Sequence, residues 1–355
     1  MTSGADAPDP KAIQEILTRA YSAPSGDNLQ PWLVERRGDA LFVSIDRNRD
    51  RSLYNLQYRA SLIALGAMLE NMTIAARQHG LGCEVALKGD QEDLLSATVR
   101  FWRATATPDP LYEYIDERCT NRRPYKRTPL KDGVLDALLQ SIPNDGVSEL
   151  TFVQDAARKR SLARVASMND RFLLEWKELH DGLFETVRWT TAEAERTRDG
   201  LFVKTLELGE TTLAFRIMRT WKGARILTLL GGKLVASVHS YRIFMQSPVF
   251  GFLQMAGDSR ESFVEGGRRL QRVWLTATSL GVSFQPMAGT LYLLQYLGDQ
   301  SVLPSEAVRQ RLVEARRVFK QTLPMRDGST PILLFRLGYG PEPSARSLRR
   351  HPSLS

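Results

Sequence analysis

The chain has 355 residues, of which 43% are hydrophobic and 25% are charged, proportions typical of a water-soluble globular protein. This length is sufficient for two domains or two fused halves with a sizeable core. Two cysteines and four scattered histidines exclude a disulfide framework and a metal site, which favours a reducing, cytoplasmic compartment. Residues 1–10 contain no apolar run, so we expect no secretory signal.

The net charge of +8 arises from 48 basic and 40 acidic residues, and the excess is concentrated in three segments. They are 118–127, 346–350 and Thr211–Gly257, the last of which contains six Lys and Arg and no Asp or Glu. Basic clusters of this kind suit phosphate groups, nucleic acids or anionic membranes. No nucleic-acid-binding motif accompanies them, so we expect no nucleic-acid partner.

In chain order, the predicted elements alternate helices with short strands. The spacing of apolar residues predicts helices over Lys11–Tyr21, Ser61–His79, Lys131–Gln140, Ala156–Leu179, Glu261–Leu280 and Ser305–Gln321. Alternation and β-branched residues predict strands over Leu41–Ile45, Cys83–Leu87, Ala97–Trp102, Leu150–Val153 and Ile332–Leu337. Helices clustered around a mostly antiparallel sheet indicate an α+β fold.

An internal repeat is present, because the helical segment Gly66–Gly80 recurs 201 residues later as Gly267–Gly281. Upstream, the loop at Pro24 aligns loosely with the loop at Pro143, an offset of 119. The difference between the offsets, 82 residues, predicts an insertion in the second copy. We therefore expect a first half over 1–108 and a second half over 109–355 with a helical insert at about 182–257. Chance similarity between two amphipathic helices is the alternative.

The segment Ala23–Trp32 is the most informative loop of the chain. Pro24 and Pro31 bracket small and amide residues, which indicates a rigid loop rather than the interior of a helix or strand. Gly26 and Asn28 tolerate backbone angles that bring the main chain close to a flat ligand. Taken alone, a simple turn explains the segment equally well.

Three later segments supply what a ligand site at this loop would need. Residues 118–122 (Arg-Cys-Thr-Asn-Arg) combine guanidinium groups with a hydroxyl, a set that suits the oxygens of a phosphate. Residues 286–289 (Pro-Met-Ala-Gly) follow the second repeat helix and offer small side chains, and residues 344–350 form a basic tail. Each segment also has a simpler explanation, respectively a solvated basic helix end, an exit from a helix and a flexible tail.

In this order the four segments resemble those that bind FMN in the nitroreductase-like flavoproteins. The resemblance covers most of the chain except the insert, and it is closest to the double-length, single-chain (Acg-like) members. It implies a nitroreductase-like fold in which the two fused halves form an intramolecular pseudo-dimer, as a monomer or a weak homodimer. FMN would bind between the halves.

The resemblance implies that one group of residues binds the phosphate and ribityl chain of FMN. In the second half these are Arg118, Cys119 and Thr120. An arginine of the tail (Arg346, Arg349 or Arg350) would close over the same phosphate. We call residues 118–122 the arm. The first half has no equivalent segment ahead of its loop, so we expect one complete site in the chain.

A second group of residues would surround the flavin ring. Arg122 would lie at the N1–C2 edge, where a cation stabilises a reduced ring. The resemblance places Ser25, Gly26, Asn28, Pro286, Met287, Ala288 and Gly289 beside the ring, with a backbone N–H of Ala288 or Gly289 meeting N5. Many relatives have a glutamate in place of Ala288, which puts the substrate contact at that position in doubt.

The resemblance implies an FMN-dependent oxidoreductase in which hydride passes through flavin N5 to or from a small organic substrate. A nitro compound, a quinone, an enone or a biosynthetic intermediate would fit, with NADPH or NADH as reductant. The alternative is a protein that sequesters FMN beneath a closed lid. Because insertions near the flavin tend to roof the pocket, the insert is interpreted as a lid, with Trp189, Trp221, Tyr241 and Phe244 as candidate walls.

The basic, apolar segment Thr211–Gly257 of the insert has two interpretations. Its apolar residues pack on the parent domain while its charges are solvated, which is the commoner arrangement and the one we favour. The alternative is contact with an anionic membrane surface.

Overall fold

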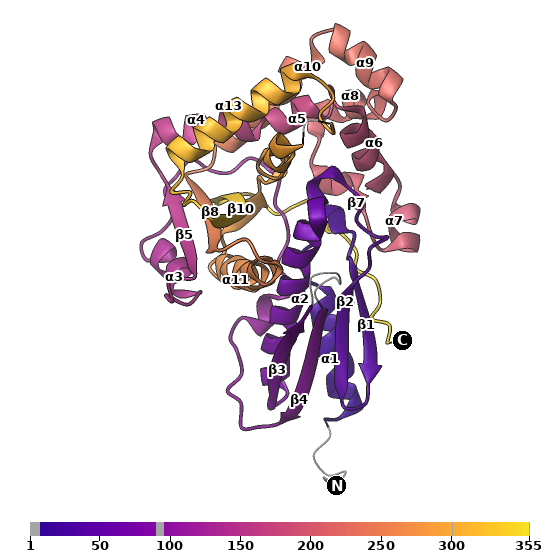
Figure 1. Cartoon of the computed structure of the whole chain (residues 1–355), viewed down its shortest axis with the longest axis vertical. Coiled ribbons are helices and arrows are strands. Elements are labelled where there is room, and N and C mark those ends of the chain that lie inside the picture. Colours follow the sequence, from indigo (N-terminus) through magenta and orange to yellow (C-terminus); the bar gives the residue numbers. More distant parts are fainter. Residues whose placement is uncertain (1–7, 90–95, 300, 355) are drawn as a thin grey trace.

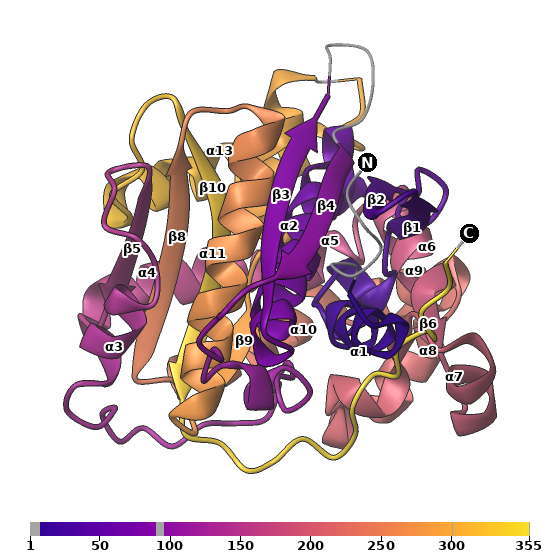
Figure 2. The ribbon, with the colours of Figure 1, turned by 90° about the horizontal axis from the view of Figure 1, so that it is seen from below.

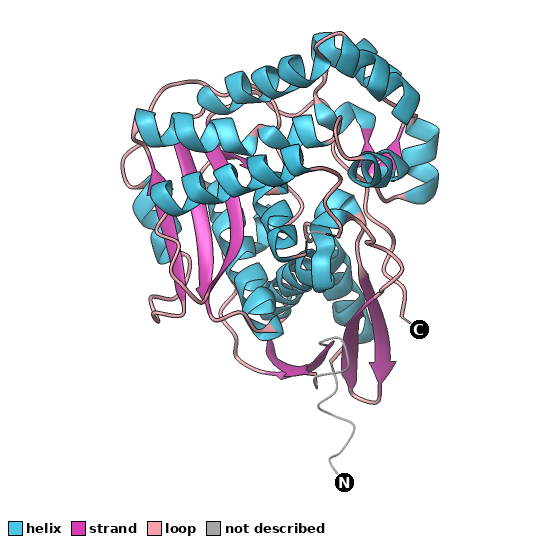
Figure 3. Cartoon of the chain, turned by 45° about the horizontal axis from the view of Figure 1, so that its top comes forward, coloured by secondary structure: helices cyan, strands magenta, loops and turns pink. Residues whose placement is uncertain are grey.

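The computed structural model describes residues 8–89, 96–299 and 301–354. Two four-stranded sheets lie on opposite sides of a pair of long helices, α2 (Arg59–Gln78) and α11 (Arg260–Ser279) (Figure 1, Figure 2). Apolar side chains from both sheets and both helices share one core. The predicted α+β fold class is therefore confirmed (Figure 3). No helix within the described ranges is long and apolar enough to cross a membrane.

The two sheets have the same strand order. The first sheet has the order β1-β2-β4-β3 and the second has the order β5-β8-β10-β9, with every neighbouring pair antiparallel. The strands of the first are β1 (Trp32–Arg37), β2 (Ala40–Ile45), β4 (Ser96–Arg103) and β3 (Leu81–Lys88). Those of the second are β5 (Ser148–Val153), β8 (Val249–Ala256), β10 (Ser329–Gly338) and β9 (Ser283–Pro286).

The two long helices cross at the glycines that the sequence repeat identified. A Cβ on Gly66 would lie 1.9 Å from the backbone oxygen of Val264, and a Cβ on Gly267 would lie 2.0 Å from that of Ile63. Ile63 and Val264 are themselves 201 residues apart, so the contact is reciprocal. Only glycine permits backbones to approach this closely. The first glycines of the two repeat copies therefore form the contact between the two halves.

The remaining helices flank these layers. The first half adds α1 (Pro10–Tyr21), and α3 (Val134–Gln140) precedes β5. The other face of the second sheet is covered by α4 (Ala156–Ala166), α10 (Gly232–Met245), α12 (Gly289–Leu293) and α13 (Glu306–Thr322), around a second core. The predicted single helix over Ala156–Leu179 is wrong. The chain turns at Ser167, whose hydroxyl donates to the Arg164 carbonyl, and three helices follow one another.

The long excursion of the second half runs between β5 and β8, over residues 154–248, where the first half has a two-residue turn between β1 and β2. Besides α4 and α10 it contains α5 (Met168–Phe172), α6 (Lys177–Thr186), β6 (Val187–Arg188), α7 (Thr191–Thr197), β7 (Leu201–Phe202), α8 (Thr212–Ile217) and α9 (Trp221–Leu229). The expected insert at about 182–257 overlaps β8, which pairs with both β5 and β10. We therefore propose 154–248 as the inserted region.

Candidate functional site

The loop at residues 23–32 adopts an unusual backbone. Asp27, Asn28 and Gln30 all have positive φ angles, of 47°, 57° and 51°, which side-chain-bearing residues rarely adopt. The Ser25 hydroxyl accepts a hydrogen bond from the Gln30 backbone N–H at 2.9 Å and closes the turn. Strained backbone held by local bonds is commonly found at ligand sites. This geometry exposes Gly26 and turns the Asn28 side chain inward.

The C-terminal tail crosses this loop, although the two are about 320 residues apart in sequence. The Asn28 amide donates to the Leu348 carbonyl at 2.9 Å, and the Arg349 guanidinium donates to the Asn28 side-chain oxygen. One residue further, the Arg350 backbone N–H donates to Gln30 Oε1 at 2.9 Å. The basic C-terminal tail is therefore held in place by hydrogen bonds to the first half.

Arg118 lies beneath this junction and is almost fully buried, with 5% of its surface exposed. One guanidinium nitrogen donates to the Ser22 carbonyl at 3.2 Å, and the group stacks over the Trp274 ring at 4.5 Å. Its Nε has no hydrogen-bond partner. Burial is the main cause that lowers the pKa of Arg118 to about 9, and the charges of Arg349 and Arg346 add to it.

Arg349 is the tail arginine that shares this environment. Burial lowers its pKa to about 10, and its Nε likewise has no partner. In the described part of the chain, neither Arg118 nor Arg349 forms an ion pair with a carboxylate. By contrast, Arg346 is exposed and bonds the Asp116 carbonyl, while Arg350 faces Gln30. The junction therefore holds one buried and one half-buried cation without a carboxylate partner among the described residues.

The arm, residues 118–122, has no regular secondary structure, so the simpler explanation of a basic helix end is wrong. Asn121 explains this: its backbone N–H donates to the Phe284 carbonyl at 2.9 Å, and its side chain donates to the Pro341 carbonyl at 2.9 Å. The arm is thus tied to β9 and to the tail. Cys119 and Thr120 are half-buried beside Arg118.

Arg122 points toward the loop of the first half. Its guanidinium donates to the Thr205 carbonyl at 3.1 Å and is close enough to Asp27 for the two charges to interact. Burial lowers the pKa of Arg122, and the Asp27 carboxylate opposes that shift.

The segment 286–289 divides into two parts. Pro286 ends β9, and Met287 is buried in the second core with its backbone N–H donated to the Leu334 carbonyl at 2.7 Å. The backbone N–H of Met287 is therefore already used within the protein, and its place beside a flavin stays a prediction. Ala288 and Gly289 begin α12 and are half-buried. A Cβ on Gly289 would lie 2.3 Å from Asn169 Oδ1, so a larger residue there would require the Asn169 side chain to move.

Asn169 connects this segment to the first half. It accepts a hydrogen bond at 2.8 Å from the hydroxyl of Tyr54, which belongs to a short 3-10 helix (Leu53–Tyr58). The pKa of Tyr54 is raised, mainly by burial and then by the charges of Asp27 and Asp170. Loop, short helix, α5 and α12 therefore converge on one place. Tyr54 and Asn169 could not be identified from the sequence, because neither lies in a recognisable motif.

Two carboxyl groups in this place titrate near neutral pH. Burial, together with the charge of Asp50, raises the pKa of Asp27 to about 6, while Arg122 opposes the shift. Burial also raises the pKa of Asp170 to about 6, and its bond from the Ser240 hydroxyl opposes it. Both residues retain intermediate exposure. These charges and bonds join Asp27, Tyr54, Arg122, Asn169 and Asp170 into one polar cluster, which we name the recess.

Residues of the inserted region cover this recess. Thr186 donates to the Asp27 carboxylate at 3.5 Å, and the Gly200 backbone N–H donates to the Asn28 carbonyl at 3.2 Å. The Arg198 guanidinium donates to the Arg349 carbonyl at 2.7 Å and its carbonyl accepts from Gln30 at 2.8 Å. The stretch from 186 to 205 is therefore a roof that is bonded to loop, arm and tail.

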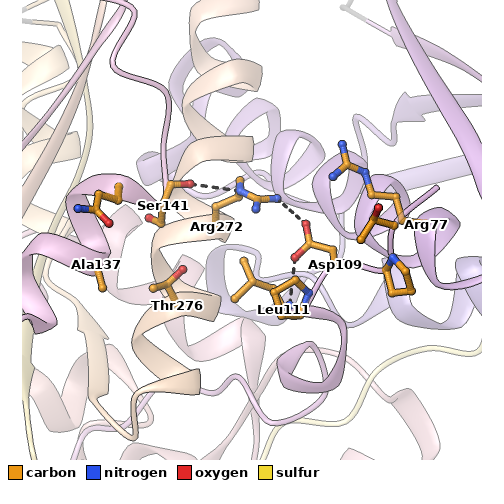
Figure 4. A pocket seen from close by; sticks show the side chains of 11 residues that line it. Arg77, Asp109, Leu111, Ala137, Ser141, Arg272 and Thr276 are labelled. Atoms are coloured by element: carbon orange, nitrogen blue, oxygen red, sulfur yellow. Dashed lines mark hydrogen bonds and ion pairs between the residues drawn. The ribbon is translucent and has the colours of Figure 1, made fainter.

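A separate hollow of about 420 Å³ lies elsewhere, where α2 and α11 meet the segment before the arm (Figure 4). Its central cation is Arg272, which pairs with Asp109 at 3.1 Å and bonds the Ser141 carbonyl (Figure 4). Arg272 also pairs with Glu70 at 2.9 Å. The charge of Arg272 is thus balanced within the protein, unlike that of Arg118. In the described ranges, no cluster of three or more His, Cys, Asp or Glu side chains could hold a metal ion.

No protein-family model matches the chain. An uncharacterized protein of Mycobacterium tuberculosis is 27% identical over 357 residues, which cover 96% of this chain but 48% of that protein. The chain thus spans about half the length of this curated relative.

Similar solved structures include an FMN-bound nitroreductase from Bacteroides fragilis, which is 13% identical to the chain and has a TM-score of 0.35. The match covers 70% of this chain and 95% of that chain. Another is an FMN-dependent nitroreductase from Mycobacterium smegmatis in complex with NADPH, with 14% identity, 64% and 86% covered, and a TM-score of 0.32. At these levels of similarity, the function has to be inferred from the residues of the chain itself.

Proposed function

We propose that the chain is an FMN-dependent oxidoreductase with one flavin site between its two halves. The observation that carries the proposal is the pair of guanidinium groups of the buried Arg118 and the half-buried Arg349, which lack a carboxylate partner among the described residues. They lie where the loop of the first half meets the arm and tail of the second. A bound anion would give both cations the partner that the protein does not supply.

The residues fit a phosphate monoester such as that of FMN. Such a group carries close to two negative charges near neutral pH and presents three strong acceptor oxygens. The unpartnered Nε atoms of Arg118 and Arg349 supply directed, charge-assisted donors. The half-buried Thr120 lies next along the arm and adds a hydroxyl. Two cations facing one dianion balance the local charge.

The adjoining recess fits the flat ring that the phosphate would anchor. Gly26 and Gly289 allow the backbone to approach closely, and Asp27, Tyr54 and Arg122 line the same recess with polar groups. When bound, FMN supplies hydride transfer through N5. The protein would hold the ring between loop and α12, place the Arg122 cation beside it and exclude water with the roof at 186–205. The small organic substrate and an NADPH or NADH reductant belong to the same proposal.

Sequestration of FMN is the second candidate, favoured by the roof. Thr186, Gly200 and Thr205 bond the loop and arm from above, so access to the ring depends on the roof opening. A protein with a permanently closed roof would retain FMN but exchange electrons slowly.

The test is to purify the full chain, saturate it with FMN and mix it anaerobically with NADPH or NADH. We expect FMN to bind the chain stoichiometrically. We also expect the absorbance of oxidised flavin, which lies at roughly 450 nm for flavins in general, to be lost when hydride reduces the ring. Bound FMN that stays oxidised would support sequestration. Failure to bind FMN at all would contradict both candidates.

A further inference from the structure

Seven large apolar side chains are exposed on α8, α9 and the start of α10, a group that we name the leucine patch. Their exposed fractions range from 42% at Ile217 to 83% at Leu229. The members are Leu213, Ile217, Ile226, Leu229, Leu230, Leu234 and Val235. Contiguous apolar surface of this kind is rare on soluble proteins and usually marks an interaction site.

The packing of these helices is inverted relative to an ordinary amphipathic helix. On α9 the buried residues are the small Gly223 and Ala224, whereas Ile226 and Leu229 face solvent. A Cβ on Gly223 would lie 1.9 Å from the Ile217 carbonyl, so α8 and α9 are held together through the smallest residue available. The expectation that the apolar residues of this segment pack on the parent domain is therefore wrong for the leucine patch.

The patch is presented outward by elements that are fixed to the rest of the protein. The far end of α10 is anchored by buried Phe244, and its middle by the bond from Ser240 to Asp170. Figure 1 shows α9 and the start of α10 at the end of the molecule opposite the first sheet. The exposed side chains thus stand at a tip, away from the recess.

Exposed basic residues flank the patch, with Glu210 just before α8 and the largely buried Glu175, which pairs with Lys233, as nearby acidic groups. The segment Thr211–Gly257 contains no Asp or Glu, and in the described part of the chain no ion pair involves Arg216, Lys222 or Arg225. All three are exposed on the same helices as the leucines. An apolar centre flanked by free cations is complementary to an anionic bilayer, whose headgroups would neutralise the charges while the side chains enter the acyl boundary.

Self-association explains the patch less well. A two-fold contact would bring the same surface of two copies together. Arg216, Lys222 and Arg225 of each copy would then face their counterparts, and because none of the three forms an ion pair in the described part of the chain, like charges disfavour such a contact. We propose that the leucine patch is a docking surface for anionic lipid membranes, by which the protein binds a bilayer peripherally.

The experiment is flotation of the full chain with vesicles of phosphatidylglycerol and phosphatidylcholine, compared with vesicles of phosphatidylcholine alone. We expect the chain to float with the anionic vesicles only, and the bound fraction to fall as salt is added because charge attraction is screened. A chain that stays at the bottom of the gradient with both vesicle types, or floats equally with both, would overturn the proposal.

The test variant replaces two patch residues, Leu229→Glu with Leu234→Glu, and the matched control replaces an exposed leucine elsewhere, Leu139→Glu on α3. We expect the double variant to lose at least about ten-fold in vesicle binding and the control to bind as the wild type does. Circular dichroism checks that both remain folded. Equal binding by the double variant would contradict the proposal. So would a dimer in gel filtration that the double variant abolishes, when the wild type binds no vesicles.

Discussion

Two buried arginines of the second half show how differently the same side chain is used. Arg336, in β10, is fully buried and donates to four neutral acceptors, of which the Gln285 side chain is at 2.6 Å and the Arg123 carbonyl at 2.8 Å. Its guanidinium also stacks over the Tyr125 ring at 3.8 Å. Arg118, equally buried, has one such acceptor and an unpartnered Nε.

The difference lies in what surrounds each charge. Neutral carbonyl and amide oxygens compensate Arg336 within the protein, so this residue joins strands, arm and insert into one structure. Arg118 instead has a second cation, Arg349, for a neighbour. A buried cation that faces another cation is costly unless a ligand completes it. Arg336 therefore belongs to the fold, and we propose that Arg118 belongs to a binding site.

The largest expected effect is that of Arg336→Met on folding. The change leaves the acceptors of Gln285, Ser247 and two carbonyls without a donor, at a cost of about 3–5 kcal/mol in the free energy of unfolding. Urea denaturation of the FMN-free protein measures this, with the exposed Arg317→Met as control. A loss below about 1 kcal/mol would show that the comparison between the two arginines fails.

Arg118→Met is expected to do the reverse. The ligand-free protein should be as stable as the wild type or more stable, because a buried cation is removed. The affinity for FMN should fall roughly ten- to hundred-fold, since a charge-assisted hydrogen bond contributes about 1.5–3 kcal/mol. Fluorescence titration with FMN measures the affinity.

The matched control for this change is Arg123→Met, which removes a charge from the same arm. Arg123 faces Glu207 at 3.6 Å rather than the Arg118 cluster, so its loss should leave the affinity for FMN within about two-fold of the wild type. Equal losses in the two variants would indicate a general electrostatic effect and not a phosphate contact at Arg118.

A third prediction concerns the pH dependence of stability through Asp27. Its pKa in the folded protein, about 6, lies above the ordinary value, so the folded state holds the proton more tightly than the unfolded state. The stabilisation is complete below pH of about 4 and is lost as the pH rises through about 6. Asp50, Arg122 and Tyr54 are the titratable groups that interact with it.

Asp27→Asn should therefore leave stability at low pH unchanged and raise it above pH 7 by on the order of 2 kcal/mol in the ligand-free protein. Thermal unfolding across this pH range measures the effect, with Asp39→Asn on the exposed β1–β2 turn as control. A wild type and variant whose stabilities run parallel across the range would rule out a buried, titrating Asp27.

The sequence was sufficient for the features that depend on local patterns or on repetition. Gly66 and Gly267 pointed to two copies because their helices share a period, and the structure gives the reason in their reciprocal contact. Arg118 and the loop at Asn28 stood out because their residue types are unusual in combination. That these residues bind a cofactor stays a prediction.

Other features depend on distances that no local pattern encodes. Tyr54, Asn169 and Gly289 lie in three unrelated segments and meet only because the two halves pack together. The insert was given bounds that overlap β8, since a buried strand such as β8 has apolar residues on both faces and lacks alternation. The exposure of the leucine patch contradicted the commoner expectation, because periodicity identifies an apolar face without saying what covers it.

The smallest expected effect is that of Gly289→Ala, which tests the recess rather than the anion site. The added Cβ would lie 2.3 Å from Asn169 Oδ1, so the Asn169 side chain must move and its bond from Tyr54 is lost or lengthened. We expect the free energy of unfolding to fall by about 1 kcal/mol. Urea denaturation and FMN titration are the measurements.

Gly182→Ala is the matched control, because that glycine lies within α6 and nothing approaches the position of its Cβ within 4 Å. Alanine is a better helix former than glycine, so this change should stabilise the protein by about 0.5–1 kcal/mol and leave FMN binding unaltered. If Gly289→Ala also stabilised the protein, the Asn169 side chain would be able to move at no cost. The bond from Tyr54 to Asn169 would then not connect α12 with the Tyr54 segment. If it weakened FMN binding several-fold while costing little stability, Gly289 would belong, with Arg118, to the binding site rather than to the fold.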